Sequence, residues 1–194
     1  MKRFLGYLVL VYILLVSSSC NIDEDITTDL GKGEFYRART AESKADWNKV
    51  YEYTPAPGQF INELKTGGFD GTQTTPKAAI AYAEARMSEE DGNGNPAPNW
   101  VSLGGFGGYI IVGFDHSIDN SGSYDIGILG NSFSGSSEPG IVWVMQDENG
   151  NGLPDDTWYE LKGSETGKPE TIQNYAVTYY RPSEPKQPVK WKDN

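Results

Sequence analysis

The chain of 194 residues has little of three things: cysteine, histidine and basic side chains. Its single cysteine, Cys20, cannot form an internal disulfide, so a disulfide-stabilised framework is excluded. Its single histidine, His116, makes His-rich zinc sites and most His-dependent catalytic triads hard to build. Acidic residues outnumber basic ones by 27 to 16, which gives a net charge of −11 with no basic stripe. Because such a chain repels phosphate backbones, we expect no nucleic-acid partner.

Long hydrophobic runs are missing as well, except near the N-terminus. Lys2 and Arg3 precede an apolar run from Phe4 to Val16, and small residues then lead to Cys20. The run is shorter than the roughly 20 residues of a spanning helix, and this order of charged, apolar and small residues is typical of a secretory signal. It resembles the lipobox of bacterial lipoproteins, with Ser17 where Leu is usual. We expect residues 1–20 to be a lipoprotein signal peptide and Cys20 to be acylated, for example with palmitate. The alternative is a coincidental cysteine beside an ordinary signal.

Three acidic residues follow directly, in the segment from Asn21 to Asp25. They resemble the acidic export tag of Bacteroidetes-type surface lipoproteins, which implies a lipid-anchored, surface-exposed place on the outer membrane. The alternative is a flexible tether that is simply acidic and solvated. We assign residues 21–47 to an acidic tether and leader.

Residues 48–194 predict an all-β domain with one short helix. The 23 glycines and the many tyrosines and tryptophans favour strands joined by turns. Thr75 as a cap and Pro76 at the first helical position predict a helix over residues 75–87, with Ile80, Ala83 and Met87 on one face. The spacing of the apolar and alternating segments predicts an antiparallel β-sandwich, jelly-roll-like. We expect its strands over residues 50–53, 109–114, 124–130, 140–146, 158–161 and 175–180. From Val189 on the chain again has strand-like residues, so we expect either a last edge strand or a domain incomplete at its C-terminus.

One loop carries oxygen side chains at alternate positions. Gly152 stands sixth from Asp147, where a calcium loop turns sharply, but Trp158 stands where an EF-hand has its last Glu. The pattern is closer to the Asp-rich calcium loops of β-domains and predicts a structural Ca²⁺. The alternative is a Gly/Asn turn without metal. The expected ligands are Asp147, Asn149, Asn151, Leu153 through its carbonyl, Asp155 and Asp156.

Signals for catalysis are weak, and we expect a protein that is not an enzyme, with no catalytic residues. His116 follows Asp115 but has no nucleophile elbow beside it, so we expect a turn histidine bonded to a neighbouring carboxylate or to the backbone. Glu138 could pair with Asp125 or Glu160 as a glycosidase dyad, although acidic β-proteins offer many such pairs.

The glycine-rich run 104–108 is not a phosphate loop. It lacks the Lys-Ser/Thr ending and precedes a predicted strand rather than a helix. We expect these glycines to permit a tight entry into that strand.

Tryptophans can stack on sugar rings or on a flat cofactor. Trp143 and Trp158 lie in predicted strands, so we expect them in the core, whereas Trp100 follows a Pro/Asn loop and is the best exposed candidate for ligand binding.

Three blocks of the sequence resemble a known group of proteins. They run over residues 53–62, 102–118 and 138–161, and they resemble the Bacteroidetes-type "cell surface protein" lipoproteins. Those proteins often carry immunoglobulin-like PKD-type modules and accompany TonB-dependent outer-membrane transporters, including ones in vitamin B12 or glycan loci. The resemblance implies a transporter partner and a longer chain than this one, and says little about the ligand.

Together these features predict a calcium-stabilised surface lipoprotein that binds a nutrient, either a glycan or a corrinoid, for a TonB-dependent transporter. Two alternatives stay open. One is a hydrolase acting on surface polysaccharide, and the other is an adhesion or scaffold module without a small ligand.

Overall fold

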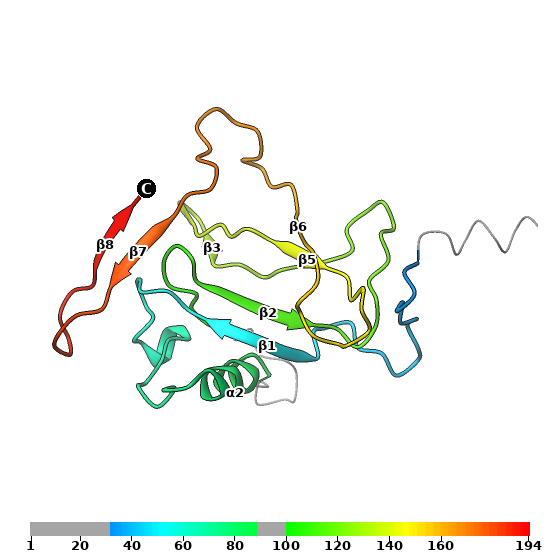
Figure 1. Cartoon of the computed structure of the whole chain (residues 1–194), viewed down its shortest axis with the longest axis horizontal. Helices are drawn as coiled ribbons and strands as arrows, with labels where there is room; N and C mark the ends of the chain where they lie inside the picture. Colours follow the sequence, from blue (N-terminus) through cyan, green and yellow to red (C-terminus); the bar gives the residue numbers. More distant parts are fainter. Residues whose placement is uncertain (1–31, 89–99) are drawn as a thin grey trace, which may run out of the picture. The chain divides into compact units, whose positions relative to one another are not determined.

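The computed structural model describes residues 32–88 and 100–194 (Figure 1). The chain divides into two units, Met1–Tyr36 and Arg37–Asn194. Everything below concerns the second unit. Residues 37–47, predicted as the end of the leader, belong to this unit together with the strands. The signal peptide, Cys20 and the acidic tag lie outside the described residues.

Eight strands and one α-helix form the regular structure of the described residues, which confirms the β-rich class with one short helix. The strands pair in four antiparallel two-stranded sheets: β1–β2, β3–β4, β5–β6 and β7–β8 (Figure 1). No sheet among the described residues is larger. The strands are β1 (Lys49–Thr54), β2 (Tyr109–Gly113), β3 (Ser132–Phe133), β4 (Ser136–Ser137), β5 (Trp143–Met145), β6 (Trp158–Glu160), β7 (Val177–Tyr180) and β8 (Lys190–Asp193), and the helices are α2 (Pro76–Met87) and the 3₁₀ turn η1 (Leu64–Thr66).

Helix α2 begins where the sequence predicts. The Thr75 hydroxyl accepts a hydrogen bond from the Ala78 N–H at 3.2 Å, and Pro76 occupies the first helical position. This cap satisfies one of the N–H groups that a helix start leaves without a partner. The predicted helix over residues 75–87 is therefore confirmed almost to the residue.

The core lies between α2 and β1. Ala83 is fully buried and Ala79 nearly so, and their small side chains let the helix approach Val50 and Tyr53 closely. Ile80 and Met87 are partly buried beside them, so the predicted apolar face is broadly right, with Ala79 as its missed member. The helix lies along β1 (Figure 1), and Ile110 and Val112 of β2 are partly buried against the same core.

Tyr53 joins the core to the loop that precedes β2. Its ring meets Phe69 edge-on at a centroid distance of 5.5 Å, and its hydroxyl donates to the Ser102 carbonyl at 2.5 Å. Burial, followed by the nearby Tyr82, raises the pKa of Tyr53 well above its usual range. The side chain therefore stays neutral and acts as a packed hydrogen-bond donor.

A bulge in β1 is satisfied from the helix. The β1–β2 register shifts between Val50 and Glu52, and the Val50 N–H donates to Glu84 Oε1 of α2 at 3.0 Å. A carboxylate thus takes the place of a missing ladder acceptor, which ties helix and strand together.

The C-terminal strands differ from the prediction in extent. Predicted strands 140–146, 158–161 and 175–180 appear as the shorter β5, β6 and β7, and the expected last edge strand is β8. The predicted strand over residues 124–130 is wrong, since these residues have no regular structure and Tyr124 is fully exposed. Alternating side chains alone do not make a strand without a partner backbone to complete its ladder. The short pair β3–β4 was not predicted.

Candidate functional site

A cleft of about 650 Å³ opens beside the end of β1. The loop after β1 and the region around η1 form one wall, and the β7–β8 hairpin forms the other, with Phe106 between them. The lining residues are Pro55, Ala56, Pro57, Gly58, Ile61, Asn62, Phe69, Phe106, Val177, Tyr179, Val189 and Trp191. A concave surface with mostly apolar walls and few polar groups is the usual form of a small-ligand site.

The first wall depends on glycines that let two loops touch. The Ala56 N–H donates to the Leu103 carbonyl at 3.0 Å. Gly104 has a φ of +76°, and a Cβ at this position would lie 1.8 Å from the Ala56 carbonyl oxygen. Only glycine fits such a backbone. The run 104–108 therefore forms the tight entry into β2 that the sequence predicts, and it also shapes the cleft.

The second wall is an aromatic pair on one hairpin. Tyr179 of β7 lies opposite Trp191 of β8, so the two side chains share a face of the sheet. The Tyr179 hydroxyl donates to the Phe106 carbonyl at 3.0 Å, and the Phe106 ring packs edge-on against Tyr175 at 4.8 Å. These two contacts join the hairpin to the loop before β2.

The sequence predicts the exposure of some tryptophans correctly and of others wrongly. Trp100 is half exposed, as predicted, but it is not among the residues that line the cleft. Trp143 is 49% exposed rather than in the core, because the narrow β5–β6 sheet leaves its side chain uncovered. Trp158 is half-buried. The cleft tryptophan is Trp191, which sequence reasoning missed; its pairing with Tyr179 in a terminal hairpin was the available signal.

The Asp/Asn loop connects β5 and β6 and is closed by its own hydrogen bonds. The two carboxylate oxygens of Asp147 accept from the N–H groups of Gly150 (2.7 Å) and Gly152 (3.0 Å). The side-chain oxygens of Asn149 and Asn151 accept from the backbone N–H groups of Asn151 (2.9 Å) and Leu153 (2.7 Å). The loop is therefore a series of Asx turns, as its composition suggests.

The same loop brings two acidic residues to the asparagine amides. The amide nitrogens of Asn149 and Asn151 donate to Asp155, and Asn149 also donates to Asp156 at 3.1 Å. The donor set is of the hard-oxygen kind that Ca²⁺ takes, yet amide N–H groups rather than oxygens face these carboxylates. Within residues 32–88 and 100–194, no group of three or more His, Cys, Asp or Glu side chains could hold a metal ion.

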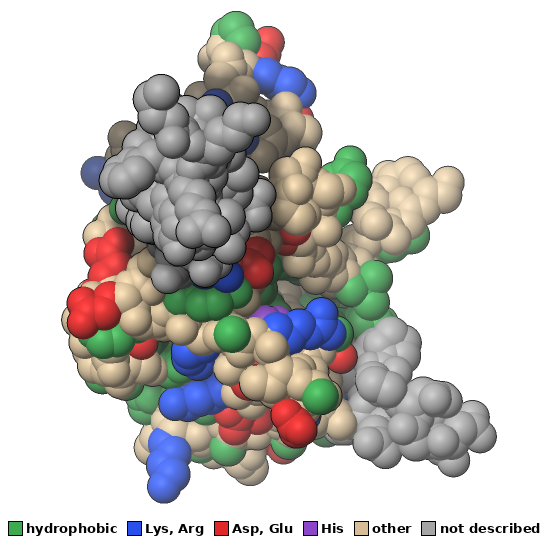
Figure 2. All heavy atoms as spheres, turned by 90° about the vertical axis from the view of Figure 1, so that its right-hand side faces the viewer, with side chains coloured by type: hydrophobic (Ala, Val, Ile, Leu, Met, Phe, Trp, Pro, Cys, Tyr) green, Lys and Arg blue, Asp and Glu red, His purple; other side chains and the backbone are tan. Residues whose placement is uncertain are grey.

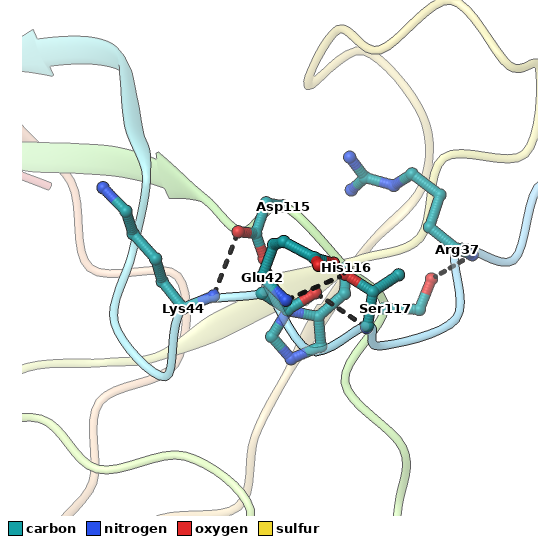
Figure 3. Close-up of polar contacts among 8 residues, drawn as sticks. Arg37, Glu42, Lys44, Asp115, His116 and Ser117 are labelled. Carbon is teal, nitrogen blue, oxygen red and sulfur yellow. Dashed lines mark hydrogen bonds and ion pairs between the residues drawn. The ribbon is translucent and has the colours of Figure 1, made fainter.

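His116 lies in a turn after β2 and contacts its neighbour. Its Nδ1 is 2.7 Å from Asp115 Oδ1, and Asp115 Oδ2 accepts the Lys44 N–H at 3.1 Å (Figure 3). The hydrogen bond with His116, and then that from Lys44, lowers the pKa of Asp115. The prediction of a turn histidine bonded to a carboxylate is confirmed.

The neighbouring Ser117 forms hydrogen bonds with the backbone of Arg37. The Ser117 Oγ accepts the Arg37 N–H at 3.0 Å, and the Ser117 N–H donates to the Arg37 carbonyl at 2.8 Å (Figure 3). Asp115 and Ser117 together fasten residues 37–44 beside the end of β2. This arrangement is a structural clamp.

Two of the three acidic residues suggested for a dyad have other partners. Glu138 accepts a hydrogen bond from Asn131 at 3.2 Å, and Asp125 accepts from Ser121 at 2.5 Å. Acidic and basic side chains lie interspersed on the face shown in Figure 2.

Comparison of the sequence with protein-family models gave no match, and comparison with curated proteins gave none either. No helix in the described parts of the chain is long and apolar enough to span a membrane. Function is therefore inferred from the site itself.

Proposed function

We propose that this chain is a non-enzymatic lipoprotein of the outer-membrane surface that captures a nutrient, a glycan or a corrinoid, for a TonB-dependent transporter. The aromatic cleft carries the proposal. Two aromatic residues of its lining, Phe106 and Trp191, are 66% and 60% exposed, and its volume of about 650 Å³ lies in the range of roughly 300–1,000 Å³ typical of small-ligand pockets.

The proposed location on the outer-membrane surface rests on the sequence of residues 1–25. A lipid on Cys20 would anchor the chain without a spanning helix. Cys20→Ser should release the protein from the membrane fraction. Labelling of intact cells with a membrane-impermeant reagent tests exposure; labelling only after the outer membrane is broken would contradict a surface location.

Calcium and the larger fold are part of the same proposal. The Asp147–Asp156 loop supplies oxygen donors suited to Ca²⁺. Rotation of the Asn149 and Asn151 amides would turn their oxygens toward an ion and would replace the bonds that those oxygens accept from backbone N–H groups. The antiparallel jelly-roll sandwich is supported by the four antiparallel strand pairs, whose edges can accept further strands. An experimental structure with calcium present tests both.

Capture is tested by calorimetry with the purified protein against a panel of glycans and cobalamin, followed by analysis of each ligand after incubation. We expect binding and recovery of the ligand intact. Shortened glycan chains would support the polysaccharide hydrolase instead, and absence of binding across the panel would support an adhesion or scaffold module.

A further inference from the structure

The cleft carries no charge. None of its twelve lining residues is acidic or basic, although the chain as a whole is strongly acidic. A ligand with a carboxylate, phosphate or sulfate inside such walls would lose hydration without gaining a positively charged partner, which is costly. The occupant is therefore neutral where it enters the cleft.

One aromatic residue of the cleft is held in place before any ligand arrives, and a second is placed by the strand register. Phe106 is fixed through its carbonyl by Tyr179 and through its ring by Tyr175. Trp191 is positioned opposite Tyr179 by the β7–β8 register. Because Phe106 does not need to be ordered on binding, little conformational entropy is lost at that residue. Exposed aromatic rings suit a ligand with flat C–H faces.

Hydrogen-bonding groups in the cleft are few. The Asn62 amide offers donors and an acceptor, the Trp191 indole N–H can donate, and the Tyr179 hydroxyl oxygen can accept. The ligand must therefore combine apolar faces with a few hydroxyl groups at its edge. A pyranose ring has this form, since its C–H groups line one face and its hydroxyls lie around the rim.

The volume of the cleft favours a glycan over a corrinoid. A cleft of about 650 Å³ falls within the range for drug-sized ligands, and a short saccharide is of that size. A corrinoid is much larger and carries many amide groups, for which this cleft has too few polar partners.

From these observations we propose that the cleft binds a neutral oligosaccharide, with one pyranose ring stacked on the Trp191 indole. The proposal rests on the proposed capture function and names its ligand class.

The test is calorimetric titration of the full mature chain with neutral oligosaccharides (cello-, xylo-, manno- and malto-series), an oligogalacturonide and cobalamin. At least one neutral series should bind, and the oligogalacturonide should bind at least about tenfold more weakly. Trp191→Ala should weaken neutral binding by about tenfold or more, as loss of an anchoring aromatic residue does. Trp143→Ala is the matched control, since Trp143 is also about half exposed and lies outside the cleft, and it should leave binding unchanged.

Folding is checked by the melting temperature of each variant, and Trp191→Phe, which keeps a ring face, should retain more affinity than Trp191→Ala. Cobalamin binding that depends on Trp191, without saccharide binding, would overturn the saccharide proposal and leave nutrient capture standing. Saccharide binding that both tryptophan variants leave unchanged would place the ligand elsewhere and overturn the assignment of the cleft. Absence of binding to every probe would overturn both the ligand class and the proposed function.

Discussion

The segment from Lys49 to Gly113 and the segment from Ile118 to Asn194 both expose large apolar side chains, but they differ in how many apolar side chains they bury. All the buried apolar residues of the described chain lie in the first: Val50, Tyr53, Ala56, Ala79 and Ala83. The second has three narrow hairpins with large apolar side chains exposed, Ile128, Leu129, Phe133 and Ile141 among them.

The difference arises from α2. A two-stranded sheet buries little by itself and needs a covering layer. Helix α2 provides such a layer against β1, and Ile110 and Val112 of β2 pack into the same core, whereas the described residues provide no helix over the later hairpins. Stability should therefore be concentrated in the first segment, and the exposed aromatic residues of the second are available to a ligand.

The largest expected loss of stability follows from substitution of Tyr53. Tyr53→Ala removes a buried ring and its hydrogen bond to Ser102, and should lower the free energy of unfolding by about 3–5 kcal/mol. Tyr159→Ala in β6, where the side chain is 57% exposed, should change it by less than about 0.5 kcal/mol. Urea denaturation of both variants measures this. Equal losses would contradict the contrast between the segments.

Calcium would reduce the contrast by stabilising the second segment. An ion bound only by the folded state at a hundredfold excess over Kd adds about 2.7 kcal/mol. Chelator should then lower the melting temperature, and Asp147→Ala should remove this sensitivity while Asp125→Ala keeps it. A melting curve that chelator leaves unchanged would favour the metal-free turn.

Substitution of the glycines before β2 tests how closely the loop before β2 approaches the loop after β1. Gly104→Ala forces a Cβ against the Ala56 carbonyl at a φ of +76°, whereas Gly107→Ala, at a φ of +84°, has nothing within 4 Å of its Cβ. Both variants incur the cost of the left-handed backbone, and Gly104→Ala should lose more than about 1 kcal/mol beyond it. Thermal unfolding compares them; equal shifts would show that the loops do not touch so closely.

The smallest expected change in stability follows from substitution of Asp115, which forms part of the structural clamp. Its pKa is lower in the folded chain than in the unfolded chain, so its charge stabilises the fold above the unfolded pKa of about 3.9. That contribution is lost as the pH falls below this value and through the folded pKa. Asp115→Asn should reduce stability at neutral pH and flatten the acid limb of the stability profile. Asp46→Asn controls for the lost charge, and identical profiles for the two variants would argue against the clamp.

Local signals in the sequence predict the first segment well. Thr75-Pro76 and the alanines predict α2, Val50 with the two tyrosines that follow predicts β1, and the β-branched run predicts β2, because capping and side-chain periodicity act over a few residues. The prediction of a strand over residues 124–130 is wrong because strand pairing depends on a partner strand that side-chain periodicity does not reveal. Trp143 is exposed for the same reason: a strand position is buried only if something covers it.

The cleft could not be predicted from the sequence because its parts are distant along the chain. Gly58 packs against Gly105, and Phe106 contacts Tyr179, contacts set by tertiary folding rather than by neighbouring residues. The His116–Asp115 contact was predictable because the two are adjacent.

Hydrogen exchange of the protein, with and without a bound neutral oligosaccharide, tests the central claim most directly. Without ligand, amides of α2, β1 and β2 should exchange most slowly, and those of β5–β8 faster. With ligand, protection should increase on both cleft walls, residues 55–62 and 177–191, and stay unchanged in β5 and β6. Protection confined to other segments, or equal exchange of the two segments in the free protein, would contradict the account.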